Sequence, residues 1–247
     1  DFDHKTHETS AETCRACHHA SLQKCGECHT PKGDEKGQFI SLTSAMHTGD
    51  AEQSCMGCHR QTQQSKDCAG CHAQMPVKSL AQTDCTTCHN FELTIDENGQ
   101  VTPAPDSAGA LAAVEARIAM RNLPQALPAD ERIPETVVID IMADQYQGAK
   151  FPHRKIVKAL FDRSADNKMA TVFHKTPETL CMGCHHNAPL EPGPPSCASC
   201  HNPAMVDESN GRPGLKGAYH VQCIGCHQQM GIEKPAATAC IECHLKK

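Results

Sequence analysis

Cysteine and histidine dominate the chemistry that this 247-residue chain could perform. All eighteen cysteines form Cys-x-x-Cys pairs, and each pair is followed directly by histidine. The cysteines are Cys14, Cys17, Cys25, Cys28, Cys55, Cys58, Cys68, Cys71, Cys85, Cys88, Cys181, Cys184, Cys197, Cys200, Cys223, Cys226, Cys240 and Cys243. The histidines that follow them are His18, His29, His59, His72, His89, His185, His201, His227 and His244.

This spacing is the attachment signature of c-type haem. Two thioether bonds hold the porphyrin, and the adjacent histidine becomes the proximal ligand of the iron. Disulfide bonds, zinc sites and iron–sulfur sites need no histidine at a fixed offset. Because all nine motifs carry it and no cysteine is left over, the sequence predicts nine covalently attached c-type haems with iron.

Eight further histidines are candidates for the second, distal position on these irons. They are His4, His7, His19, His47, His153, His174, His186 and His220. Two imidazoles close both faces of an iron, which suits electron transfer because nothing has to bind or leave. Eight histidines cannot serve nine irons. At least one haem is therefore expected to have another ligand or an open face.

The composition argues against an interior built from side chains alone. Hydrophobic residues make up 38% of the chain, a figure that includes the cysteines, and there are no Trp, 2 Tyr and 6 Phe. We therefore expect porphyrins to fill the interior, inside a mostly irregular fold with short α-helices and little β-structure. A mean hydropathy of −0.50 without a long apolar run excludes a transmembrane segment. A net charge of −6 makes nucleic-acid binding improbable.

The motif spacing repeats. Motifs one to four and motifs six to nine each follow a short–long–short pattern, and the first motif of each block carries a second histidine. This predicts an N-terminal tetrahaem module over 1–80 and a C-terminal one over 151–247. The fifth haem, on Cys85, is predicted to stand alone in the connecting segment 81–150. That segment predicts a hairpin over 91–101, a helix over 107–121 and a strand over 137–142. A helix is predicted to open the second module over 151–163.

Several longer motifs carry a family resemblance. They are His4-x-x-His7 ahead of CRACHH, FPHRKIV at 151–157, CMGCHHNAP at 181–189 and YHVQCIGCHQQM at 219–230. In these features the chain resembles the multihaem cytochrome c3 family of sulfate-reducing bacteria, most closely its nine-haem members. The resemblance implies two c3-like tetrahaem modules plus one isolated haem.

The resemblance also implies a ligand pattern. In the first module, His4 would serve the Cys14 haem, His7 the Cys55 haem, His19 the Cys25 haem and His47 the Cys68 haem. In the second module, His153 would serve the Cys181 haem, His186 the Cys197 haem and His220 the Cys240 haem.

The sequence departs from the family pattern at position 156, where isoleucine replaces the second histidine of His-x-x-His. The missing histidine would cap the Cys223 haem, which is then expected to be open, while His174 caps the Cys85 haem. A competing account gives His174 to the Cys223 haem and leaves the Cys85 haem open. A thioether from Met75, Met205 or Met230 is a further candidate for the vacant position.

These features predict a carrier of electrons and not an enzyme. Haem attachment takes place outside the energy-conserving membrane, and a first residue other than Met is expected if a targeting segment has been removed, so a periplasmic location is predicted. By resemblance, the partners are a small basic c3 cytochrome, periplasmic hydrogenase and a membrane redox complex in anaerobic sulfate respiration. The alternatives are a reductase acting on a small molecule at the open haem, or a fixed subunit of a membrane quinone-linked complex.

Overall fold

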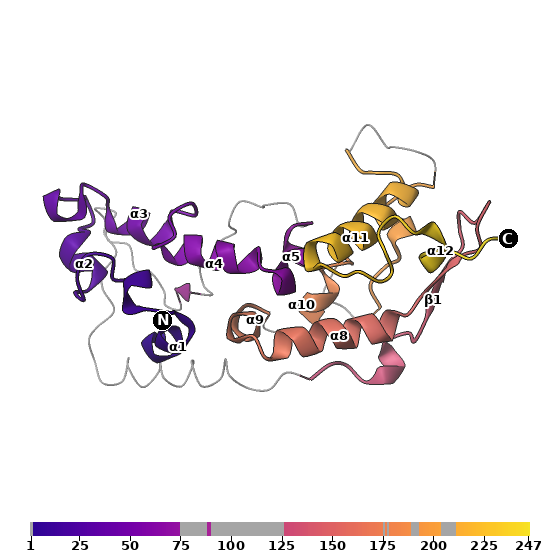
Figure 1. Cartoon of the computed structure of the whole chain (residues 1–247), viewed down its shortest axis with the longest axis horizontal. Helices are drawn as coiled ribbons and strands as arrows, with labels where there is room; N and C mark the ends of the chain where they lie inside the picture. The colour runs from indigo at the N-terminus through magenta and orange to yellow at the C-terminus, as the bar shows by residue number, and fades with distance from the viewer. Residues whose placement is uncertain are drawn as a thin grey trace, which may run out of the picture. The chain divides into compact units, whose positions relative to one another are not determined.

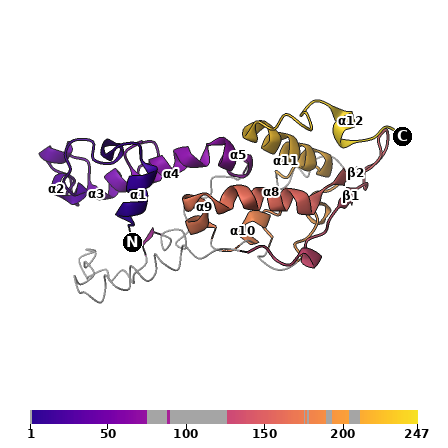
Figure 2. The same ribbon diagram turned by 60° about the horizontal axis from the view of Figure 1, so that its bottom comes forward.

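The computed structural model describes residues 2–74, 88–89, 126–174, 176, 178–188, 193–203 and 211–247. It divides into two compact units, Asp1–Cys68 and Ala69–Lys247. In the described residues, short helices alternate with irregular segments, as Figures 1 and 2 show. This agrees with the fold class predicted from composition and motif spacing. The three-part division at 80 and 150 stays a prediction, since its first boundary lies outside the described residues.

The first unit contains helices of at most nine residues in its described part. They are α1 (His4–Ser10), η1 (Cys14–Ala16), α2 (Cys25–Cys28), η2 (Glu35–Gly37), α3 (Leu42–His47) and α4 (Cys55–Gln63). Helix α5 (Lys66–His72) begins here and continues into the second unit. Side-chain caps start four of these helices: Asp3 accepts from the Thr6 amide, Asp34 accepts from the Gly37 amide at η2, and Ser41 and Ser54 do the same for α3 and α4.

The second unit contains the two longest described helices. Its elements are η3 (Asp130–Arg132), β1 (Val137–Ile139), β2 (Ala149–Phe151), α8 (His153–Ala165), α9 (Lys168–Phe173), α10 (Glu178–Cys181), η4 (Cys197–Ser199), α11 (Leu215–Met230) and α12 (Cys240–Cys243). Helix α11 ends where Gly231 adopts φ 64°, the left-handed conformation that glycine permits without steric cost. The Asn167 side chain caps α9.

Most predicted elements in the described ranges are confirmed. Strand β1 occupies the first half of the predicted 137–142 strand, and α8 matches the helix predicted over 151–163. Strand β2, which pairs antiparallel with β1 in the register Val137↔Phe151, was not predicted. The hairpin at 91–101 and the helix at 107–121 lie outside the described residues.

Few apolar side chains of the described residues are buried by protein atoms. Ala69, Ile133, Leu215 and Met230 are the buried apolar residues in this part of the chain, and Leu215 alone is fully inaccessible. Large apolar side chains such as Leu22 and Phe39 are each 76% exposed. This is the arrangement expected if bound porphyrins supply the missing apolar mass. No helix among the described residues is long and apolar enough to span a bilayer.

Candidate haem-binding sites

Each haem motif lies on a single helical turn wherever the structure describes it well enough to judge. In five motifs the histidine amide donates to the carbonyl of the first cysteine at 2.7–2.9 Å; these histidines are His18, His29, His185, His201 and His244. Positions i, i+3 and i+4 share one face of such a turn. Both sulfurs and the imidazole of a motif therefore face the same side. None of the described cysteines forms a disulfide bond.

Seven of the motif histidines face a second imidazole. Every such pair joins one motif histidine to one histidine from outside the motifs, with ring centroids 5.8–6.3 Å apart. The pairs are His18 with His4, His59 with His7, His29 with His19, His72 with His174, His185 with His153, His201 with His186 and His244 with His220.

This separation fits an iron held between two imidazoles. With metal–nitrogen bonds of about 2 Å and a ring centre about 1 Å beyond the nitrogen, the centroids of two axial ligands lie about 6 Å apart. Ring contacts with Phe or Tyr range from 4.4 Å for Phe2 and His7 to 6.0 Å for Tyr146 and His244. The seven pairs therefore have the spacing that haem needs, together with two cysteines beside each proximal histidine.

Six of the seven pairs agree with the ligand pattern implied by the family resemblance. The seventh corrects it. His72 is paired with His174, whose ring lies 6.0 Å away and within 12° of parallel. This contact differs from both predicted assignments of His174, to the Cys85 haem and to the Cys223 haem, and from the predicted pairing of His47 with the Cys68 haem. The physical reason is that α5 passes into the second unit at Ala69, so His72 belongs with α9 and His174.

Backbone carbonyls orient many of these imidazoles. The Nδ1 atom of His7, His18, His29, His47, His185 or His201 lies 2.7–3.2 Å from a carbonyl oxygen in each case. A carbonyl has no proton to give, so Nδ1–H donates and Nε2 keeps its lone pair free. This is the tautomer that binds a metal through Nε2.

Burial keeps several of these imidazoles neutral. It lowers the pKa of His72 and of His174. The nearby His72 ring lowers the pKa of His174 further. Burial likewise lowers the pKa of His59, His153 and His220. A neutral imidazole is the form that binds iron, so the protein holds these side chains ready for ligation at neutral pH.

Two proximal histidines are not among the seven pairs, His89 and His227. Cys88 and His89 are described, whereas Cys85 lies outside the described residues. His227 lies in α11, and among the residues that the structure describes no second imidazole is paired with it. Of the eight spare histidines, His47 is the one that the seven pairs leave over.

The face of α8 next to α11 carries no histidine at position 156. His153, Ile156 and Arg163 are three and seven residues apart, so they form one stripe along α8. His153, at one end of this stripe, pairs with His185. At the other end, the charge of Arg163 counteracts the burial that raises the pKa of Cys226, which places that end beside motif eight. Ile156 thus supplies an apolar group where the family pattern has a ligand.

One methionine candidate for the vacant position, Met230, is described by the structure. The Met230 sulfur lies 3.6 Å from Cys226 Sγ, and the residue is 7% exposed. It therefore acts as packing in α11. Met75 and Met205 lie outside the described residues.

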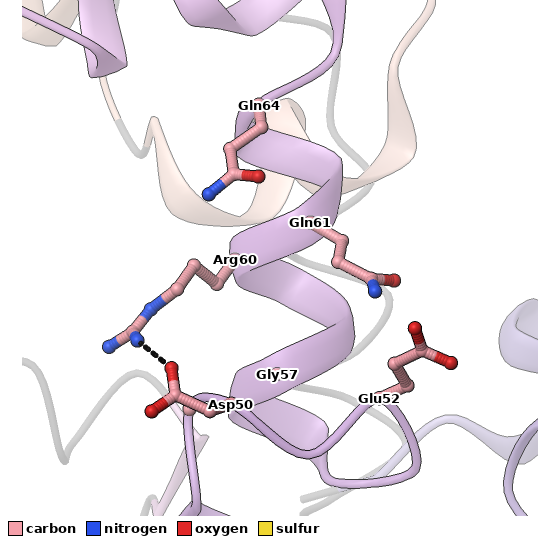
Figure 3. A pocket seen from close by; sticks show the side chains of 7 residues that line it. Asp50, Glu52, Gly57, Arg60, Gln61 and Gln64 are labelled. Atoms are coloured by element: carbon pink, nitrogen blue, oxygen red, sulfur yellow. Dashed lines mark hydrogen bonds and ion pairs between the residues drawn. The ribbon is translucent and has the colours of Figure 1, made fainter.

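An open polar pocket borders α4. Figure 3 shows Arg60 paired with Asp50 at 3.0 Å, with Glu52, Gln61 and Gln64 around them. Gly57, Arg60, Gln61 and Gln64 share one face of the helix, whereas Cys55, Cys58 and His59 share the opposite face. The pocket is therefore turned away from the haem of its own motif and is not a distal pocket.

The paired imidazoles and cysteine motifs define a multihaem c-type cytochrome that transfers electrons. Residues 1–89 and 152–244 match the class III cytochrome c family, and the chain belongs to this family. The first matched stretch contains five motifs, including the Cys85 motif.

Individual relatives agree. High-molecular-weight cytochrome c of Nitratidesulfovibrio vulgaris is 44% identical over all of this chain, which spans 46% of that relative. Nine-heme cytochrome c of Desulfovibrio desulfuricans is 38% identical over 98% of this chain and 78% of its own length. Among solved structures, the sixteen heme cytochrome from Desulfovibrio gigas matches all of this chain with a TM-score of 0.84 at 40% identity, over 48% of that chain. This chain therefore covers about half the length of the larger relatives.

The Glu8 carboxylate is expected to lower the midpoint potential of the Cys14 haem. It lies 3.1 Å from Nδ1 of His4 and makes that imidazole a stronger donor, which stabilises ferric iron. Glu8→Gln should raise the potential on the order of 10–40 mV, because exposed ion pairs contribute about 0.2–1 kcal/mol. Redox titration followed by haem-resolved NMR measures it. Glu12→Gln, an exposed change outside α1, is the control; equal shifts in both variants would contradict a specific role for Glu8.

Proposed function

We propose that this chain is a periplasmic nine-haem electron carrier of anaerobic sulfate respiration. It takes electrons from hydrogenase through a small basic c3 cytochrome and passes them to a membrane redox complex. The observation that carries this proposal is the set of seven imidazole pairs, since an iron closed on both faces exchanges electrons and not ligands. Haem would supply the one-electron chemistry. The chain's histidines would ligate the iron, and its cysteines would hold the porphyrin in place.

The pairing of His174 with His72 supports a revised ligand set. If the Cys68 motif is the extra one, the first module comprises the motifs of Cys14, Cys25, Cys55 and Cys85. This fits the family match over 1–89. His47 then serves the Cys85 haem. This follows the pattern in which the spare histidine that precedes the third motif of a module is the ligand of the haem on the fourth motif. The Cys223 haem is left without a distal histidine.

An acidic stretch beside η3 and β1 is suited to a basic partner. The segment 91–150 contains ten acidic and four basic residues. Asp130 is neutralised by Lys158 at 2.8 Å, and the hydrogen bond from Lys158 lowers its pKa. Asp140 and Asp144 are exposed and form no ion pair with the described residues. Unpaired carboxylates of this kind attract a cationic protein and speed its approach.

Neutralising Asp140 and Asp144 together is expected to slow reduction by a basic tetrahaem c3 cytochrome severalfold at low salt. The difference should disappear at high salt, because a Debye length of about 10 Å at 0.1 M already screens most of the attraction. Stopped-flow mixing of the holoprotein with reduced c3 cytochrome measures the rate. Reduction by a small neutral reductant is the control and should not change. Equal rates with c3 cytochrome at all salt concentrations would contradict docking at this stretch.

The proposal as a whole is tested by hydrogen-driven reduction. Hydrogenase under hydrogen should reduce the holoprotein quickly when catalytic amounts of c3 cytochrome are present and slowly without them. No acceleration would contradict the proposed place in the electron path.

A second candidate function, small-molecule reduction, is favoured by one observation. His227 has no paired imidazole among the described residues, which leaves a face for a substrate. Against it, Ile156 offers no acid or base where such a reaction needs one. Turnover of nitrite or hydroxylamine by the reduced protein would support the reductase, and its absence would support the carrier.

A further inference from the structure

The haem motifs of Cys68, Cys181 and Cys223 meet one another through glycines. In each of these motifs the residue before the second cysteine is glycine: Gly70, Gly183 and Gly225. The two residues between the cysteines face away from their own haem, because both cysteines and the histidine occupy the other side of the turn. The glycine faces are therefore free to receive a neighbouring motif. In both views, the end of α5 meets α11 (Figures 1 and 2).

The contacts at two of the glycines leave no room for a side chain. A Cβ on Gly183 would lie 2.9 Å from Cys71 Sγ and 3.4 Å from Cys71 Cβ. A Cβ on Gly70 would lie 2.9 Å from Cys226 Sγ and would also strike the Met230 side chain. Real Cβ atoms essentially never come within 3.0 Å of another heavy atom in this way. The sulfur of one motif thus touches the backbone of the next.

These contacts form one continuous series. Cys226 Sγ touches Gly70, which is bonded to Cys71; Cys71 Sγ touches Gly183, which is bonded to Cys184. The three haem-bearing sulfurs therefore lie in one crowded cluster within the second unit.

Helix α11 holds this cluster together. Met230 is buried against Gly70, and its sulfur lies 3.6 Å from Cys226 Sγ. Five residues earlier on the same helix, Gly225 packs against the Gln74 side chain, which follows α5. Two separate contacts therefore fix the end of α5 on α11.

We propose that Gly70 and Gly183 are positioning residues for electron transfer. Each lets a haem-bearing sulfur of one motif lie against the backbone beside the second cysteine of another, so that the Cys68 motif would link the Cys181 and Cys223 motifs. The inference rests on the proposed carrier function. In each step one ferrous haem is oxidised and its ferric neighbour is reduced by one electron, with no bond made or broken. An external one-electron reductant supplies the electron.

Gly183→Ala and Gly70→Ala test this role. Each added methyl must push a haem-bearing sulfur away, so redistribution of an electron among the three haems should slow severalfold. Pulse-radiolytic reduction of the oxidised holoprotein measures the rate. EPR should also show weaker magnetic coupling between neighbouring low-spin haems. Haem content and the number of low-spin haems should stay the same, which separates positioning from loss of structure.

Gly26→Ala is the matched control. Gly26 lies between the cysteines of motif two, but its nearest heavy atom to an added Cβ is Leu42 Cδ2 at 4.0 Å. This variant should transfer electrons at the wild-type rate. If Gly183→Ala is as fast as Gly26→Ala while c3 cytochrome still reduces the protein, the relay is wrong and the carrier function stands.

A second comparison covers the case in which Gly183→Ala does not mature. The double variant Gly70→Ala with Met230→Ala removes the methionine side chain that the new methyl group would strike. Of the neighbours of Gly70 named above, the Cys226 sulfur is then the one left in close contact with this methyl group. The double variant should be severalfold slower than Met230→Ala alone. Equal rates in these two proteins would overturn the proposal.

Discussion

Replacing His174 with alanine is expected to convert the haem on Cys68 and Cys71 from low-spin to high-spin. The His174 ring lies 6.0 Å from that of His72 and nearly parallel to it, and burial lowers the pKa of both imidazoles so that they are neutral. Loss of one axial imidazole leaves a five-coordinate iron. EPR of the oxidised protein should show one more high-spin haem than in the wild type, and added imidazole should restore the low-spin signal.

A matched variant identifies which haem is affected. His47→Ala removes the histidine that we assign to the Cys85 haem, so haem-resolved NMR should place the high-spin change at the Cys85 haem in His47→Ala and at the Cys68 haem in His174→Ala. If His174→Ala leaves the spectrum unchanged, a different residue completes the Cys68 haem and our ligand set is wrong.

Introducing histidine at position 156 is expected to abolish the open haem. Ile156 lies on the α8 stripe between His153, which pairs with His185, and Arg163, whose charge acts on Cys226. A histidine there restores the His-x-x-His pattern, whose second histidine would cap the Cys223 haem. The wild-type protein should bind carbon monoxide at one reduced haem, and Ile156→His should bind none. Optical titration with carbon monoxide measures this.

Lys155→His is the control for that change. It lies one residue away on the same helix, about 100° around the axis, and is exposed. It should leave carbon monoxide binding intact. If Ile156→His still binds one equivalent, the open iron is at another motif, and the Cys85 haem becomes the candidate.

The covalent part of the sites could be predicted from sequence because it is local. Two cysteines and a histidine within one helical turn need no tertiary structure to define a haem motif. Distal histidines near their motifs were also predictable; His19 and His186 each follow directly after the histidine of the preceding motif. The resemblance extended this to six of the seven pairs.

The His72–His174 pair could not be predicted because about a hundred residues separate its members. Five motifs precede the long gap, whereas a c3-like module has four, and counting alone does not tell which of the five is extra. The passage of α5 into the second unit supports the Cys68 motif as the extra one. The match of residues 1–89 to the family includes the Cys85 motif, which argues against that motif as the extra one.

Contacts between motifs could not be predicted from the sequence either. A glycine between two cysteines is unremarkable in composition, and its meaning emerges when Cys71 Sγ is found against Gly183. Likewise β2 is three residues long and is stabilised by pairing with β1, so its local pattern is weak. The segment 151–163 was predictable as a helix because its length and pattern are sufficient.

The proposed carrier function depends most on the number of irons closed by two histidines. Quantitative EPR of the oxidised holoprotein, with carbon monoxide added after reduction, counts them directly. We predict eight low-spin haems and one high-spin haem that binds carbon monoxide. Nine low-spin haems without a carbon monoxide adduct would contradict the open Cys223 site. Two or more high-spin haems would contradict the paired imidazoles on which the carrier function rests.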